Sequence, residues 1–157
     1  MNNVEINKQA KLSQHFTLGE LCKTSVRTAD GNIPSHAAIE NLKRLSGWLE
    51  MLRSEWNNRY GDGDDPIIIN SGYRSPQVNK AVGGVATSNH LTGCAVDIRV
   101  LGMEQLLRYA VILLDISDES QEDFDELLIE RNAKGTYWLH FAVRPEGNRR
   151  KIRLIAC

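Results

Sequence analysis

The stretch SNHLTGCAVDIRV (residues 88–100) opens with polar residues, turns at Gly93 and continues as an apolar run that contains Asp97. Successive side chains of a β-strand point to opposite faces, so the apolar residues of this run share one face and Asp97 lies on the other. The stretch therefore predicts a strand with one face toward a core. Its carboxylate points away from that core and follows a loop histidine, His90, by seven residues.

A second strand-like segment, TYWLHFAV (residues 136–143), sets a histidine apart in the same way. Alternation separates His140 from the larger apolar side chains of that segment. His90, Asp97 and His140 could therefore converge on the open side of a sheet. Two imidazoles and one carboxylate are a typical catalytic zinc set that leaves a fourth position for water. Spacing alone leaves open the alternative that each histidine is a hydrogen-bonded structural residue.

The order of the predicted elements indicates the fold class. Thr17 and Glu20 have the spacing of a capping box at the start of a short helix. The SDESQED run is expected to be a solvated loop. Helices that come mainly before strands favour an α+β fold with helices packed on one face of a mostly antiparallel sheet, which ends in an antiparallel meander. The patterns predict helices over 36–56, 77–82 and 103–115, and strands over 67–74, 94–100, 124–130, 136–143 and 151–157.

Composition restricts the class of protein. A chain of 157 residues with 41% hydrophobic and 25% charged residues is expected to form a single domain over 1–157. A net charge of −1 favours neither nucleic acid nor an anionic membrane as a partner, and leaves the oligomeric state open. Three widely spaced cysteines, Cys22, Cys94 and Cys157, are more typical of reduced thiols than of a disulfide framework. The polar N-terminal segment lacks the apolar core of a secretory signal, so synthesis in the cytoplasm without export by a signal is expected.

Several ordered motifs resemble one family. The pattern SxHxxGxAVDI, at residues 88–98, is similar to the signature of the zinc D-Ala-D-Ala carboxypeptidase family of peptidoglycan peptidases, and WLHFAV resembles its second histidine motif. FTLGEL, IIINSGYRSPQVNKAVGG and FDELLIE resemble the branch found in phage and bacterial cell-wall lysins, so the resemblance covers nearly the whole chain. It implies a hedgehog/DD-peptidase-like fold, Zn²⁺ as cofactor, and His90, Asp97 and His140 as the zinc ligands.

The resemblance also implies roles for Arg74 and Ser88. Arg74, in SGYRS, matches an arginine that lies over the metal site in the family. A guanidinium there can hold a substrate carbonyl or carboxylate and stabilise the oxyanion of a tetrahedral intermediate. Ser88 is expected to orient the metal loop or to contact substrate. A surface arginine and an ordinary turn serine are the alternatives.

The general base is the point at which the sequence departs from the family pattern. Several members carry an acidic residue three positions before the second histidine, where this chain has Tyr137. The branch with a WxH motif instead has an acid at the end of the preceding strand, which corresponds to Glu130. Asp125 and Glu126 are weaker candidates, and a solvated carboxylate at a strand edge is the alternative for Glu130.

The sequence thus predicts a zinc-dependent peptidase that hydrolyses amide bonds in peptidoglycan stem peptides. Both a D-Ala-type carboxypeptidase and a lysin endopeptidase fit, and the bond cut is left open. A phage or prophage lysin, acting on the cell wall after release, is expected because no signal peptide is recognised. The alternative is a non-catalytic metal-binding domain of the same fold, acting as a binding or structural module, for which Tyr137 is the best support.

Overall fold

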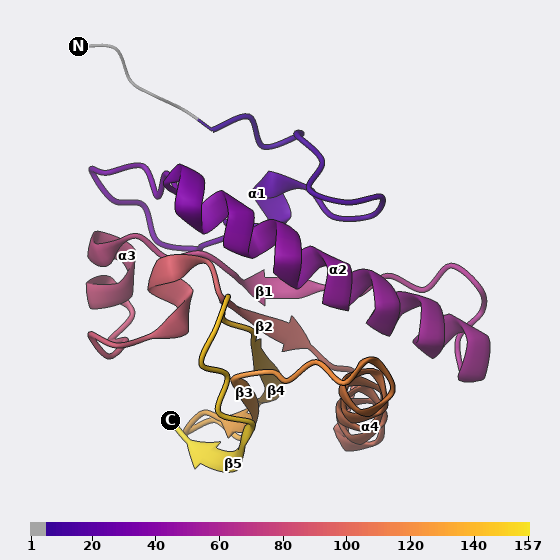
Figure 1. Cartoon of the computed structure of the whole chain (residues 1–157). Helices are drawn as coiled ribbons and strands as arrows, with labels where there is room; N and C mark the ends of the chain where they lie inside the picture. The colour runs from indigo at the N-terminus through magenta and orange to yellow at the C-terminus, as the bar shows by residue number, and fades with distance from the viewer. Residues whose placement is uncertain (1–5) are drawn as a thin grey trace.

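The computed structural model describes residues 6–157 and has the expected α+β architecture, with helices and a five-stranded sheet (Figure 1). The elements in chain order are α1 (Leu18–Leu21), α2 (His36–Arg59), β1 (Ile69–Ser71), α3 (Pro76–Ala81), the 3₁₀ turn η1 (Asn89–Thr92), β2 (Ala95–Arg99), α4 (Met103–Ser120), β3 (Glu126–Arg131), β4 (Tyr137–Ala142) and β5 (Lys151–Ala156).

The sheet has the strand order β1-β2-β4-β3-β5, and its last strand departs from the prediction. The β1–β2, β2–β4 and β4–β3 pairs are antiparallel, whereas β5 pairs with β3 in parallel. The predicted meander is therefore wrong at β5. β4 is already paired with β2 on one side and with β3 on the other, so β5 cannot pair with β4. The chain instead crosses the end of β3, and β5 pairs with the free edge of β3. Backbone hydrogen bonds from Arg150 to Phe124 and from Lys151 to Asp125 fix that crossing.

Two long helices cover one face of the sheet. Ser35 caps α2 by accepting a hydrogen bond from the Ala38 N–H, and the helix runs three residues beyond the predicted end. The prediction ends α4 at 115, but the helix continues to Ser120, because Ile116 and Ser117 extend its buried face. Most of the expected acidic loop is thus helical, and the helix ends where Gln121 adopts a left-handed conformation with φ 59°.

The apolar core lies between these helices and the sheet. Trp48 of α2 packs on Phe141 of β4 with ring centroids 5.4 Å apart, and Phe124 packs on the same ring at 5.8 Å. Phe124 and Phe141 have no exposed surface. None of the helices in the described part of the chain has the length and apolar character needed to cross a membrane.

The short elements α1, β1 and α3 can be compared with the sequence patterns at their ends. The capping box at Thr17 and Glu20 is present, with both reciprocal hydrogen bonds. Ser75 caps α3 by accepting a hydrogen bond from the Val78 N–H, and Pro76 is the first residue of the helix. The predicted strand 67–74 shrinks to β1, because the chain then leaves the sheet to form the turn that carries Arg74. All three cysteines are free thiols.

Candidate metal centre

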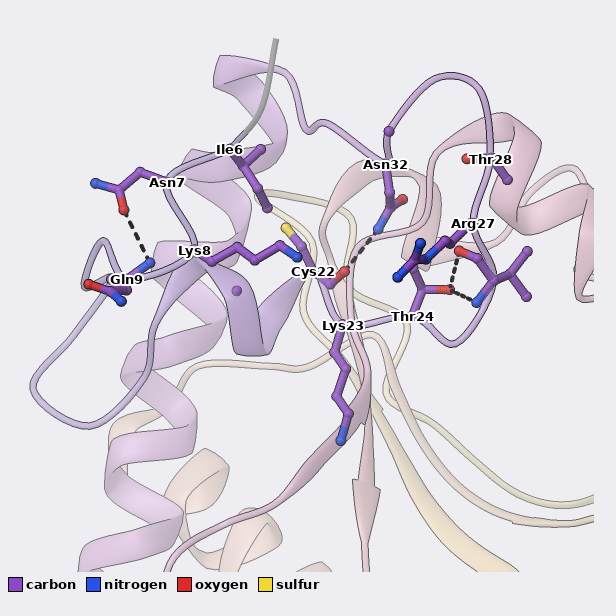
Figure 2. A pocket seen from close by; sticks show the side chains of 13 residues that line it. Ile6, Asn7, Lys8, Gln9, Cys22, Lys23, Thr24, Arg27, Thr28 and Asn32 are labelled. Carbon is purple, nitrogen blue, oxygen red and sulfur yellow. Dashed lines mark hydrogen bonds between the residues drawn. The ribbon is translucent and has the colours of Figure 1, made fainter. Parts of the chain in front are cut away.

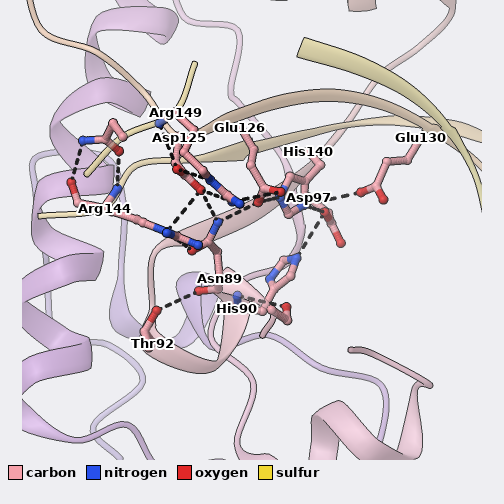
Figure 3. Close-up of polar contacts among 12 residues, drawn as sticks. Asn89, His90, Thr92, Asp97, Asp125, Glu126, Glu130, His140, Arg144 and Arg149 are labelled. Atoms are coloured by element: carbon pink, nitrogen blue, oxygen red, sulfur yellow. Dashed lines mark hydrogen bonds and ion pairs between the residues drawn. The ribbon is translucent and has the colours of Figure 1, made fainter. Parts of the chain in front are cut away.

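His90, Asp97 and His140 meet on the face of the sheet opposite the helices. Each offers a ligand atom, and these atoms all lie within 4.8 Å of one another. Asp97 Oδ1 is 3.4 Å from His90 Nε2 and 3.0 Å from His140 Nδ1. All three residues are less than 9% exposed. The predicted triad is therefore a single buried cluster, as Figure 3 shows.

The side chain of Ser88 and the turn at Gly93 hold His90 in place. The Ser88 hydroxyl accepts a hydrogen bond from the His90 N–H at 3.2 Å, and Gly93 returns the chain to β2 with φ 73°. A side chain at Gly93 would clash with the backbone of α2, since its Cβ would lie 2.5 Å from the Ala38 oxygen. Gly72 O lies 2.7 Å from His90 Nδ1 and can only accept, so Nδ1 carries hydrogen and Nε2 faces Asp97.

Sheet register places the other two residues. Asp97 of β2 pairs directly with His140 of β4, so both side chains emerge on the same face. Burial alone would raise the pKa of Asp97, but the imidazoles of His90 and His140 outweigh it and hold that pKa well below its usual range.

His140 is held between carboxylates. Burial alone would lower the pKa of His140, but hydrogen bonds to Asp97 and Glu126 raise it well above its usual value. Each ring nitrogen thus faces a carboxylate oxygen, which accepts hydrogen bonds. The space between Nδ1 and Asp97 Oδ1 is the place that a cation shared by the two residues would take.

A polar network lies behind His140. Glu126 Oε1 is 3.0 Å from His140 Nε2 and accepts a 2.6 Å hydrogen bond from Asn89 Nδ2. The same amide nitrogen donates to Asp125, which is fully buried and bound in bidentate fashion by Arg149 at 3.0 and 2.8 Å. Although burial opposes ionisation, these hydrogen bonds, led by Arg149, lower the pKa of Asp125 to about 2. Asp125 therefore serves as a structural anion.

Arg74 lies at the cluster, as its motif predicts. Its Nη2 is 3.3 Å from Asp97 Oδ2, and its Nε donates to Ser71 Oγ at 3.2 Å. The buried Asn32 fixes the turn around it, by donating to the Tyr73 carbonyl at 3.3 Å and accepting from the Ser75 N–H at 2.7 Å. The backbone on both sides of Arg74 is thus clamped by one amide side chain.

Glu130 approaches the cluster from β3. Its Oε1 is 3.4 Å from His140 Nδ1, the nitrogen that faces Asp97, and accepts a hydrogen bond from Trp138 Nε1 at 3.1 Å. Tyr137, three positions before His140, packs against the apolar core. An odd offset from His140 within a strand leads to the opposite face, so a base could not act from Tyr137 here.

A cleft of about 690 Å³ opens over the cluster. The three clustered residues, Arg74, Glu126 and Glu130 all line it, together with Ser88. Ser88 has the loop-capping contact described above, and its contact with substrate stays a prediction. Arg144, Arg149 and Lys151 give one part of the rim a positive charge, and Trp138 and Cys157 line another part.

A larger hollow of about 840 Å³ lies near the N-terminal segment (Figure 2). Its polar lining includes Lys8, Lys23 and Arg27, and no histidine or acidic residue is among the described residues that line it. Size therefore does not identify the candidate site. The smaller hollow has the groups that can bind a metal ion and move protons.

Comparison with known proteins identifies the family. A sequence profile described as Peptidase M15 matches residues 14–113, which include His90 and Asp97. The chain belongs to the peptidase M15 family. It is also similar to a zinc D-Ala-D-Ala carboxypeptidase of Streptomyces albus G, with 31% identity over 84 residues. That match covers 54% of this chain and 31% of the Streptomyces protein, so it spans about a third of the relative.

The cluster of this M15 domain suits zinc by its donor set and its spacing. Ligand atoms about 2.0–2.2 Å from a tetrahedral zinc ion are themselves roughly 3.3 Å apart. The two distances from Asp97 Oδ1, 3.4 and 3.0 Å, match that spacing. Neutral imidazoles and a carboxylate are ordinary zinc ligands. His90, with Nδ1 donating to a backbone carbonyl, already has the arrangement usual for a zinc-binding histidine.

Sequence reasoning missed two polar residues around the site of this M15 domain. Asn89 and Asn32 act through contacts with chain segments more than 30 residues away, so local pattern contains no sign of them. Glu126 was named as a weaker candidate for the general base, and the structure places its Oε1 beside Nε2 of His140. Which nitrogen of His140 each carboxylate approaches depends on register and rotamer, and only the structure reveals it.

Proposed function

We propose that this M15 domain is a zinc-dependent peptidase that hydrolyses amide bonds in the stem peptides of peptidoglycan. The observation that carries the proposal is the His90–Asp97–His140 cluster, whose spacing fits one zinc ion and which opens into a cleft. Bound zinc would polarise the scissile carbonyl and lower the pKa of water at the site. Similarity to a zinc D-Ala-D-Ala carboxypeptidase supports a peptide bond next to D-alanine as the substrate.

Arg74 is proposed to bind the substrate carbonyl. Its guanidinium lies beside Asp97 Oδ2 and lines the cleft, so a carbonyl oxygen near the metal would meet both positive charges. Donors held in place before the reaction stabilise the developing oxyanion without further reorganisation. The hydrogen bonds of Asn32 to the flanking backbone support this role, because they fix the backbone from which the Arg74 side chain extends.

Glu130 is the proposed general base. Its Oε1 lies on the Nδ1 side of His140, the side that also faces Asp97, and its side chain is half-buried. From there a carboxylate can take a proton from the attacking water and return it to the leaving amine. Asp125 suits this role poorly because Arg149 and Arg144 neutralise it, and Glu126 because it lies on the far side of the imidazole ring.

The proposal is favoured over a non-catalytic binding module by the presence of this carboxylate. The module interpretation takes its support from Tyr137, which packs against the core on the other face of the sheet. Action as an endopeptidase or carboxypeptidase, and release as a phage or prophage lysin, remain predictions of the sequence.

Digestion of purified peptidoglycan tests the proposal, with fragments identified by mass spectrometry. The zinc-loaded protein is expected to release peptide fragments, a chelator to stop the release, and added zinc to restore it. Asp97→Ala should be inactive, whereas Asp62→Ala, which changes an exposed loop acid, should match the parent protein. Intact wall after incubation with the zinc-loaded protein would favour the binding module, and digestion that survives chelation would exclude a metal mechanism.

A further inference from the structure

Glu126 faces Nε2 of His140, the ring nitrogen that lies away from Asp97. Its Oε1 lies 3.0 Å from Nε2, whereas Asp97 Oδ1 lies 3.0 Å from Nδ1 (Figure 3). The Glu126 side chain is 15% exposed, so it is no ordinary surface carboxylate. Glu126 and Glu130 thus approach the same imidazole at different nitrogens.

The position of Glu126 is itself fixed by Asn89. The amide nitrogen of Asn89 donates to Glu126 Oε1 at 2.6 Å and to Asp125 Oδ2 at 2.8 Å. Its amide oxygen accepts from Arg144 Nε at 2.9 Å. Because a cation binds the oxygen and two carboxylates bind the nitrogen, only one orientation of this amide satisfies its partners.

The anchor of this arrangement is the buried ion pair between Asp125 and Arg149. Two hydrogen bonds join them, and the Arg149 N–H also donates to Asp125 Oδ1 at 3.1 Å. A fully buried carboxylate with these partners does not rotate away without leaving charge unpaired. The sequence of contacts from Arg149 through Asp125, Asn89 and Glu126 therefore ends at His140 Nε2.

Such an acceptor decides which nitrogen of an imidazole is free to bind a cation. A neutral histidine has one hydrogen, and a carboxylate beside Nε2 keeps that hydrogen there and leaves the Nδ1 lone pair available. Acceptors of this kind also hold the ring plane and make the ligating nitrogen more basic. His90 has the same arrangement with the nitrogens exchanged, because Gly72 O accepts from its Nδ1.

We propose that Glu126, held by Asn89, is a positioning residue that keeps hydrogen on His140 Nε2 and directs Nδ1 into the metal site. The inference rests on the proposed function only in taking His140 as a zinc ligand. It assigns different roles to the two glutamates of β3, since Glu126 acts on metal binding and Glu130 acts on the proton in catalysis.

Zinc affinity, measured by competition with a chromophoric chelator, separates these roles. Glu126→Ala removes the acceptor and is expected to weaken zinc binding by about tenfold or more. Glu126→Gln keeps an acceptor oxygen and should restore affinity to within about threefold of the parent protein. Glu130→Gln is the matched control on the same strand, and should keep zinc affinity while hydrolysis falls.

The proposal is overturned if Glu126→Ala binds zinc as tightly as the parent protein, or if Glu126→Gln is as weak as the alanine variant. Should the alanine variant not fold, the ¹⁵N shifts of the His140 ring in the zinc-loaded parent protein still decide. Hydrogen on Nε2 supports the proposal, and hydrogen on Nδ1 overturns it. If the parent protein binds no zinc, the proposed function fails together with the positioning role, an outcome distinct from an unaffected alanine variant.

Discussion

The two faces of the sheet are built from alternate residues of the same strands, yet one face is apolar and the other carries charged and polar side chains. On the face toward α2 and α4, Val96, Leu139 and Phe141 have no exposed surface and belong to one apolar core. On the other face Asp97 and His140 are also buried, but each is bound by charged or polar partners. Apolar burial stabilises the first face, whereas the second must satisfy every charge that it buries.

This difference separates stability from chemistry. Removal of an apolar side chain leaves a cavity whose cost depends on volume. Removal of a polar side chain from the other face is expected to change metal binding or proton transfer, because these side chains surround the proposed metal site. Substitutions on the apolar face should therefore change the free energy of unfolding, whereas substitutions on the polar face should change zinc binding or hydrolysis.

Phe141→Ala is expected to give the largest effect, and it falls on stability. The ring packs between Trp48 and Phe124, so its loss should lower the free energy of unfolding by about 3–5 kcal/mol. Denaturant titration measures this value. Leu154→Ala is the control, because that side chain is 72% exposed on β5 and should cost less than about 0.5 kcal/mol. Equal losses in both variants would contradict the assignment of the core.

Glu130→Gln sharpens the comparison on the polar face. The substitution keeps size and removes the proton acceptor, so hydrolysis of peptidoglycan should fall by roughly two orders of magnitude or more. Zinc content and the denaturation midpoint should not change. Tyr137→Phe, on the core side of the neighbouring strand, should alter hydrolysis by less than about twofold. Full activity of the glutamine variant would show that Glu130 is a bystander and that another group is the base.

Arg74→Ala should have a smaller effect of the same kind. Turnover should decrease roughly tenfold to a hundredfold, because bound zinc would polarise the same carbonyl. Zinc content, measured by atomic absorption, should be unchanged, since the guanidinium donates hydrogen bonds and cannot ligate a metal. Arg27→Ala, in the N-terminal hollow, serves as the control. Loss of zinc from the Arg74 variant alone would argue against a role toward substrate.

The sequence was informative where one strand alone determines the outcome. Alternation correctly separated Asp97 and His140 from the apolar rows, and the glycine at 93 correctly indicated a tight turn before β2. The direction of β5 was not predictable in this way, because it depends on which edge of the sheet is free. The hydrogen bonds of Asn32 and Asn89 were equally hidden, since their partners are brought near only by the finished fold.

We propose that the polar face of the sheet binds one zinc ion through His90, Asp97 and His140. A crystal structure of the zinc-loaded protein with anomalous scattering at the zinc edge tests it most directly. We predict one strong peak, about 2.0–2.2 Å from His90 Nε2, an Asp97 oxygen and His140 Nδ1. A peak elsewhere in the molecule, or none at this cluster in a protein saturated with zinc, would exclude these three residues as the zinc ligands.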